Sequence, residues 1–345
     1  MTHCEPHTTK DPPIPSPALE TGEPAITAVV FSRDRAMQLD AVLTSLTDHC
    51  REASAIRIDI LYTASTPFLA RQYAVLERTW RAALNIRFHR ESDFRTDLLA
   101  LLDTSAAPSQ SLSRQVGDFV RHPTRRTERH HRPEEGMSYV LFLVDDNIFV
   151  RDFSFLPAIT ALILHPRAIG VSLRLGRNTE YCYSLDAPQR IPHLAAAGDG
   201  VLVFDWTNAE HDFGYALEVS SSLYEAGHLR RVLGGLKFDN PNTLESQFAG
   251  TSTRWWARRH PELLCYDRSV AFCNAVNKVQ AVYNNRSGKE IALSPHELAM
   301  RFDRGERIDT QAFRRFTPNA CHCAVPFAFT QDRASQGAPS PCGLE

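Results

Sequence analysis

Two acids and an amide follow the most apolar run of the sequence and offer the clearest chemistry in the chain. The run covers residues 139–144, and Asp145, Asp146 and Asn147 come directly after it. A short apolar run without alternation predicts a strand that is covered on both faces, as in a mostly parallel sheet. Adjacent carboxylates at the end of such a strand are costly unless a cation lies between them. Their oxygens suit Mg²⁺ or Mn²⁺ shared with substrate phosphates. The alternative is a strand that ends in a solvated turn, where Asp and Asn are common.

A second polar group follows the first apolar strand of the chain. Residues 26–31 (ITAVVF) predict this strand, and Ser32, Arg33 and Arg35 follow it before a helical pattern over residues 36–46. A backbone nest and a guanidinium at a strand end suit a phosphate or a base ring. The alternative is that Arg33 or Arg35 pairs with an acid on the surface.

The elements that would position these groups alternate between strand and helix. A predicted strand over 56–62 brings Asp59 and Tyr62 toward its carboxyl end, and a strand over 85–89 precedes Asp93. Ligands of such sheets bind beyond the carboxyl ends of the strands. The fold class is therefore α/β: a Rossmann-like, mostly parallel central sheet with helices on both faces. Further strands are predicted over 169–173 and 201–204, and further helices over 68–84, 98–102, 153–164, 220–233 and 294–304.

Composition bounds the kind of partner. The chain has 345 residues and a formal net charge of −2, so it has no general attraction for nucleic acid or anionic membranes. Its apolar runs are too short for a transmembrane segment. No basic region followed by an apolar core begins the chain, so we expect no signal peptide and a cytoplasmic location.

The sequence divides into one large domain and three peripheral parts. Residues 1–24 predict a disordered leader, 25–285 the catalytic domain, 286–330 a C-terminal helical extension and 331–345 a disordered tail. Within the domain, residues 103–137 are crowded with Arg and His. This segment predicts a mobile surface insertion, and the alternative is a basic flap over an anionic substrate or an acidic partner.

Together these motifs resemble the nucleotide-sugar glycosyltransferases of the GT-A type, close to the family-2-like group. The resemblance rests on residues 31–35 after the first strand, Asp93-Phe94 after the third, Val144-Asp145-Asp146-Asn147 in place of the DxD metal motif, and Glu245 downstream. It covers roughly residues 25–285. Asn147 departs from the pattern, because an Asp is usual there.

The resemblance implies a hexosyltransferase-like enzyme. It would move a sugar from a nucleoside-diphosphate sugar to a hydroxyl of a glycan, a lipid-linked or a small-molecule acceptor, with Mn²⁺ or Mg²⁺. Inversion is the expected outcome, and retention, which would not need Glu245 as a base, is the alternative. Glu245 is the first choice as the base that takes the acceptor proton, and Glu218 or Asp212 is the second. The alternative for Glu245 is a carboxylate that stabilises a helix N-terminus. The implied metal ligands are Asp145, Asp146 and Asn147. The implied donor-binding residues are Ser32, Arg33, Arg35, Asp59, Tyr62, Asp93 and Asp146.

Two rival functions use the same fold. One is a non-catalytic module that binds a nucleotide sugar or a glycan, which the neutral Asn147 and the unproven base leave open. The other is a sugar nucleotidyltransferase, which also uses acids at strand ends. Residues 32–35 contain no glycine, whereas such enzymes usually carry a glycine-rich phosphate loop there.

Overall fold

The computed structural model describes residues 25–105, 138–250, 257–277, 286, 288, 291 and 293–331. The predicted leader, nearly all of the predicted basic insertion (residues 106–137) and nearly all of the predicted tail (residues 332–345) lie outside these described residues. Within them, no helix combines the length and the apolar character needed to cross a membrane.

A nine-stranded sheet forms the centre of the described structure, in the order β3-β2-β1-β4-β11-β6-β12-β10-β9. All but β11 and β10 run in the same direction, because these two strands alone pair antiparallel with each of their neighbours. The prediction of a mostly parallel α/β sheet is therefore confirmed. The strands are β1 (Ala25–Arg33), β2 (Arg57–Thr63), β3 (Asn85–Arg90), β4 (Ser138–Val144), β6 (Ala168–Ser172), β9 (Ala195–Gly198), β10 (Val201–Asp205), β11 (Ser222–Glu225) and β12 (Glu262–Tyr266).

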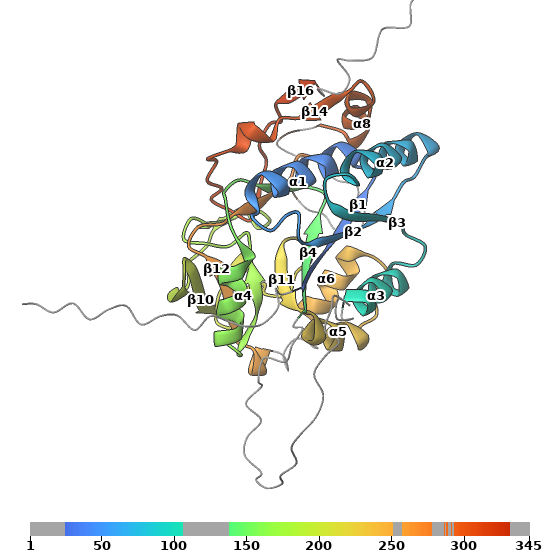
Figure 1. Ribbon diagram of the computed structural model, residues 1–345. Helices are drawn as coiled ribbons and strands as arrows, with labels where there is room; N and C mark the ends of the chain where they lie inside the picture. The colour runs from blue at the N-terminus through green and yellow to red at the C-terminus, as the bar shows by residue number, and fades with distance from the viewer. Residues whose placement is uncertain are drawn as a thin grey trace, which may run out of the picture.

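Helices cover both faces of this sheet (Figure 1). One core packs α1 (Ala36–His49), α2 (Pro67–Trp80), α4 (Phe155–Leu164) and α8 (Pro295–Asp303) against one face. The other core packs α3 (Phe94–Ser105), α5 (Ala226–Gly234) and α6 (Pro241–Ala249) against the opposite face. The alternation of side chains explains the division: Val30 in β1 faces the first core, whereas Val29 and Phe31 face the second.

Strand order sets the place of the ligand crevice. From β1 the chain crosses to β2 and β3 on one side, and it later returns to β4 on the other side of β1. The carboxyl ends of β1 and β4 therefore form a topological switch point, where open α/β sheets bind their ligands.

A second, three-stranded sheet begins next to the switch point and has the order β15-β13-β5. Strand β5 (Asn147–Phe149) comes directly after the two acids, β13 is Ala271–Asn274, and β15 is His322–Cys323. The segment predicted as a C-terminal helical extension therefore contributes β15 to this sheet as well as the helix α8. The other short elements are β7 (Tyr181–Cys182), β8 (Ala187–Pro188), η1 (His211–Gly214), β14 (Glu306–Ile308), η2 (Thr310–Phe313) and β16 (Phe329–Gln331).

One element differs in type from its prediction. The apolar spacing after residue 220 predicts a single helix over 220–233, but residues 222–225 form β11 and the helix begins at Ala226. Ser222, Leu223 and Tyr224 are buried, and β11 pairs with both β4 and β6. Tertiary pairing thus overrides a helical pattern that rests on a few leucines.

Candidate active site at the carboxyl ends of the strands

The structure brings the two polar groups that the sequence singles out into direct contact. Ser32 and Arg33 end β1, and Asp145 follows the neighbouring strand β4 in register with them. The Asp145 amide donates to the carbonyl oxygen of Phe31 over 3.1 Å, which continues the strand pairing by one residue. The two polar groups therefore lie side by side at the carboxyl edge of the sheet.

Asp145 is fully engaged by groups of the protein. Its Oδ1 accepts a hydrogen bond from Arg35 Nη1 over 2.9 Å. Its Oδ2 accepts from Ser32 Oγ and from the Arg33 amide, each over 3.0 Å. The residue is only 4% exposed. Asp145 therefore does not fit the predicted role of a metal ligand as it lies here, because a guanidinium already supplies its cation.

Asn147 also needs correction as a metal ligand. Its side-chain oxygen accepts from the Val144 amide over 2.8 Å, and its Nδ2 donates to the Ser220 carbonyl over 2.8 Å. Nδ2 also lies 3.3 Å from Ser221 Oγ and 3.2 Å from Cys273 Sγ. An aspartate has no donor for these acceptors, so the buried position requires an amide. Asn147 fastens the turn after β4 and faces no cation.

Asp146 retains an available carboxylate oxygen. Its Oδ1 is buried and has no hydrogen-bond partner among the described residues, and its Oδ2 lies 3.7 Å from Arg35 Nη1. Burial raises the pKa of this carboxyl; Arg35 opposes that effect, and Asp145 adds to it. Over the described part of the chain, no cluster of three or more His, Cys, Asp or Glu side chains is arranged to hold a metal ion. The three predicted ligands do not fit a divalent metal as a set, whereas a role for Asp146 toward the donor stays a prediction.

Aromatic side chains support the turn after β1. Ser32 Oγ lies 2.7 Å from the hydroxyl of Tyr73, which also accepts from the Arg35 amide over 3.2 Å. The Tyr62 ring stacks on Tyr73, with 4.4 Å between centroids. Ser32 and Tyr62 therefore lie at the predicted edge, but Ser32 is buried and bonded within the protein.

Arg33 and Asp93 are the exposed members of the predicted donor site. Arg33 ends β1, and its side chain is exposed to solvent. Asp93 lies after β3, and its Oδ1 accepts from the Thr96 amide over 2.8 Å at the start of α3. Hydrogen bonds from Thr96 lower the pKa of Asp93, so this carboxylate stays ionised at the carboxyl edge of the sheet.

Asp59 is wrong as a donor-binding residue. It is fully buried near the middle of β2, and its two oxygens lie 2.7 Å from Arg57 Nε and 2.8 Å from His89 Nε2. A buried carboxylate below the strand end, paired with an arginine and bonded to a histidine, contributes to the sheet and does not reach the crevice.

Glu218 does not fit the role of a base, because it forms a buried ion pair with Arg174. Its Oε2 accepts from Arg174 Nη2 and from the Ser220 amide, and its Oε1 accepts from Ser222 Oγ. Both side chains are nearly inaccessible. A carboxylate held inside the protein by three hydrogen bonds and an ion pair is not placed to meet an acceptor hydroxyl.

Glu245 has the properties expected of a general base. Its Oε1 accepts from the Val219 amide over 3.1 Å and from Ser220 Oγ over 3.3 Å, so the side chain is oriented toward β11. The residue is partly exposed. Burial of the carboxyl, and next the negative charge of Glu218, raise the Glu245 pKa from 4.5 to about 7. A carboxyl poised near neutral pH can take and release a proton during turnover.

Asp212 remains the second choice. It lies in η1, its Oδ1 accepts from Cys182 Sγ over 3.6 Å, and its buried Oδ2 has no partner among the described residues. Burial raises the Asp212 pKa, against the attraction of Arg174. This carboxylate lies among cysteines, which makes it less suited than Glu245 to meet an acceptor hydroxyl.

Arg174 and two side chains that it contacts, His322 and Cys273, were not predicted as part of the site. Arg174 follows β6 at the same edge, and its Nη1 donates to His322 Nε2 and Cys273 Sγ, each over 3.2 Å. Burial, and then Arg174, lower the His322 pKa to about 3, so this imidazole is neutral and accepts. The position of Arg174 directly after a predicted strand was the signal available in the sequence. His322 stands in the close group Cys321-His322-Cys323, but that group lacks the second pair of a zinc site, and Cys273 had no signal in the sequence.

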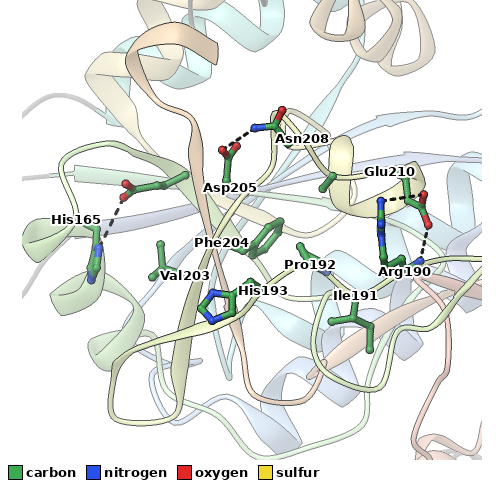
Figure 2. A pocket seen from close by; sticks show the side chains of 12 residues that line it. His165, Arg190, Ile191, Pro192, His193, Val203, Phe204, Asp205, Asn208 and Glu210 are labelled. Carbon is green, nitrogen blue, oxygen red and sulfur yellow. Dashed lines mark hydrogen bonds and ion pairs between the residues drawn. The ribbon is translucent and has the colours of Figure 1, made fainter.

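A separate cavity of about 640 Å³ lies elsewhere (Figure 2). It is lined by residues from β10 and from the segment before β9, and also by His165 and Glu262. Glu262 begins β12, so this cavity is at the amino end of a parallel strand and away from the switch point. It is therefore not the donor crevice that the topology indicates.

Comparison with known proteins gives the chemistry a context. No protein-family model matches the chain. Over 290 residues the chain is 21% identical to the bifunctional glycosyltransferase pgtA of Dictyostelium discoideum, an alignment that covers 76% of this chain and 33% of that protein. The chain is related to a glycosyltransferase. This relationship confirms the resemblance stated from the sequence, and the chain spans about a third of the length of that relative.

Solved structures of glycosyltransferases resemble the chain only distantly. TarS of S. aureus covers 72% of this chain at 12% identity with a TM-score of 0.42, and the match covers 36% of the TarS chain. TarS 1–349 in complex with UDP-GlcNAc covers 81% at 10% identity with a TM-score of 0.41, over 65% of that chain. The mannosyltransferase PcManGT of Pyrobaculum calidifontis, in complex with GDP-Man and Mn²⁺, covers 70% at 13% identity with a TM-score of 0.34, over 55% of that chain. Because these TM-scores are low, the fold is assigned from the strand topology described above and not from these structures.

Proposed function

We propose that this protein is a glycosyltransferase that moves a sugar from a nucleoside-diphosphate sugar to a hydroxyl acceptor with inversion. The observation that carries the proposal is a carboxyl with a pKa of about 7, Glu245, at the same edge of the sheet as the β1/β4 switch point. Hydrogen bonds link the two sites: Asn147 Nδ2 donates to the Ser220 carbonyl over 2.8 Å, and Ser220 Oγ donates to Glu245 Oε1 over 3.3 Å. The relationship to pgtA supports the same class of reaction.

In this proposal Glu245 acts on the acceptor, and the donor binds beyond the ends of β1 and β4. The acceptor oxygen attacks the anomeric carbon and forms the new glycosidic bond as its proton passes to Glu245. The bond from the anomeric carbon to the diphosphate oxygen breaks, and its electron pair leaves with the nucleoside diphosphate. Attack opposite to the leaving group inverts the anomeric configuration, and a positioned base of this kind contributes typically about 10²- to 10⁴-fold.

The donor occupies the crevice beyond β1 and β4 in this proposal. The exposed guanidinium of Arg33 meets the diphosphate, since an arginine fork matches phosphate oxygens. Asp93 accepts hydroxyls of the nucleotide at the start of α3, and the unpartnered Asp146 Oδ1 accepts a hydroxyl of the ribose or the sugar. A divalent cation bound with the diphosphate would add Lewis-acid stabilisation of the leaving group. The three predicted ligands do not provide its site as arranged, and no step here depends on it.

A transfer assay with a panel of nucleoside-diphosphate sugars tests the proposal, together with thermal shifts by the matching nucleoside diphosphates. We expect one nucleotide to raise the midpoint of unfolding and its sugar donor to support transfer or slow donor hydrolysis. Glu245→Gln is expected to keep nucleotide binding and to lose turnover. The exposed Glu180→Gln is the matched control and should retain both.

The two rival functions predict different outcomes of the same experiments. Nucleotide or glycan binding without turnover of any donor, with Glu245→Gln indistinguishable from wild type, would favour a binding module. Release of pyrophosphate from a nucleoside triphosphate and a sugar 1-phosphate would favour a nucleotidyltransferase.

A further inference from the structure

We propose that the guanidinium of Arg35 takes the place of a divalent cation between Asp145 and Asp146, so that the protein binds its donor without a metal at these acids. The inference rests on the proposed function for the identity of the donor. Its structural basis is independent of that function. Arg35 Nη1 lies 2.9 Å from Asp145 Oδ1 and 3.7 Å from Asp146 Oδ2, so its positive charge lies between the two carboxylates.

Arg35 is fixed at this position from three directions. Its Nη2 donates to the Asn277 carbonyl over 2.8 Å, and its backbone amide donates to the Tyr73 hydroxyl over 3.2 Å. Asn277 is itself held, because its Nδ2 donates to Gln38 Oε1 over 3.1 Å. With 8% exposure, the arginine has little freedom to swing aside for an ion.

The charge of Arg35 is as permanent as its position. The guanidinium lies between two carboxylates, Asp145 and Asp146, which both favour its charged form. A guanidinium is not deprotonated in proteins, so the positive charge persists across the working pH range. A divalent ion at the same acids would be repelled by this charge at close range.

The neighbouring residues agree with a site that needs no metal. Both oxygens of Asp145 already have donors, and the amide of Asn147 is used inside the protein. Two carboxylates and one arginine leave a formal charge of only −1 here, whereas an aspartate in place of Asn147 would add a third negative charge. In this arrangement the exposed Arg33, at the adjacent turn, neutralises the charge of the diphosphate.

Titration of free Mn²⁺ with the intact wild-type chain tests the inference, with the electron paramagnetic resonance signal of the free ion as the readout. We expect the signal to stay at the protein-free level up to millimolar Mn²⁺. Nucleoside-diphosphate thermal shifts should be equal in EDTA and in Mn²⁺. A stoichiometric loss of the free-ion signal that Asp145→Asn abolishes would overturn the inference, whatever the catalytic activity.

Arg35→Ala supplies the complementary measurement. Removal of the guanidinium exposes two carboxylates to each other, and we expect Mn²⁺ affinity to rise by at least about tenfold. Arg177→Ala is the matched control, since it frees the exposed Asp267 from an ion pair of 2.9 Å and should gain no Mn²⁺ affinity. A folded Arg35→Ala protein without this gain would contradict the inference. If Arg35→Ala does not fold, the wild-type titration decides alone. Failure of every nucleotide to bind would refute the proposed function and leave the Mn²⁺ result standing.

Discussion

Replacement of Glu245 by Gln tests the central assignment through stability as well as activity. The amide keeps an oxygen that accepts from the Val219 amide and Ser220 Oγ, so the local geometry is preserved. It removes only the negative charge that burial and Glu218 make unfavourable. The variant should therefore fold at least as well as wild type at neutral pH and lose about 10²- to 10⁴-fold in turnover.

The sign of the stability change follows from proton linkage. The Glu245 pKa rises from 4.5 in the unfolded chain to about 7 in the folded one, so the folded state binds more protons between these values. The free energy of unfolding of the wild type then falls as pH rises from about 4.5 to about 7 and is constant above. This contribution is absent from Glu245→Gln.

The size of the effect has an upper limit. At about 1.36 kcal/mol per pKa unit, a rise from 4.5 to about 7 corresponds to at most about 3.4 kcal/mol. Solvent reaches the partly exposed side chain and screens it, so we expect roughly half of this value. The unfolding free energy of Glu245→Gln minus that of wild type should thus increase by about 1.5 kcal/mol from pH 4 to pH 8.

Urea unfolding at pH 4, 6 and 8 measures the gain, with Glu180→Gln as the control that should follow wild type. Donor turnover over the same pH range should rise through a midpoint near 7 in wild type. The reasoning is refuted if Glu245→Gln and wild type show parallel stability profiles, or if the variant retains full turnover.

Three further substitutions address the buried pairs and the exposed arginine. Asp145→Asn leaves Arg35 buried without an anion at 2.9 Å, so we expect a loss of about 3–5 kcal/mol in urea unfolding, and a loss under 1 kcal/mol would contradict the pairing. Glu218→Gln removes the partner of buried Arg174 and should cost about 3–5 kcal/mol in the same assay, the opposite sign from Glu245→Gln. Arg33→Ala should change stability by less than about 0.5 kcal/mol yet weaken nucleoside-diphosphate binding about tenfold in isothermal titration. Unchanged binding would remove Arg33 from the donor site.

The sheet was predictable because its central strands are covered on both faces. Uninterrupted apolar runs placed β1 and β4 within two residues of their observed ends and thereby located Ser32 and Asp145 at one edge. The pattern failed at β11, whose residues Ser222 to Glu225 carry two apolar side chains. Spacing cannot separate so short a strand from the helix that follows, and its pairing with β4 and β6 is visible only in three dimensions.

The partners of the charged residues were the part that the sequence left undetermined. Arg35 and Asp145 are 110 positions apart, and Arg174 and Glu218 are 44 apart, so neither pair leaves a local signal. Both acids were predicted to act on substrate because their types and their edge location suit it. Only the tertiary structure shows that each already has a buried cation.

Asp59 differs, because its pairing could be inferred from local spacing. Arg57 and Asp59 are two residues apart on one strand, so both side chains point to the same face of the sheet, and the register puts them beside β3, which carries His89. Asp59 also lies four residues before the end of β2, too far down the strand for the crevice. Distance from the strand end is therefore a stricter filter for ligand-binding acids than residue type. Applied to the other candidates, it keeps Asp145, Asp146 and Asp93, which follow strands β4 and β3 within three residues, and the hydrogen bonds of Asp145 within the protein then set it apart from the other two.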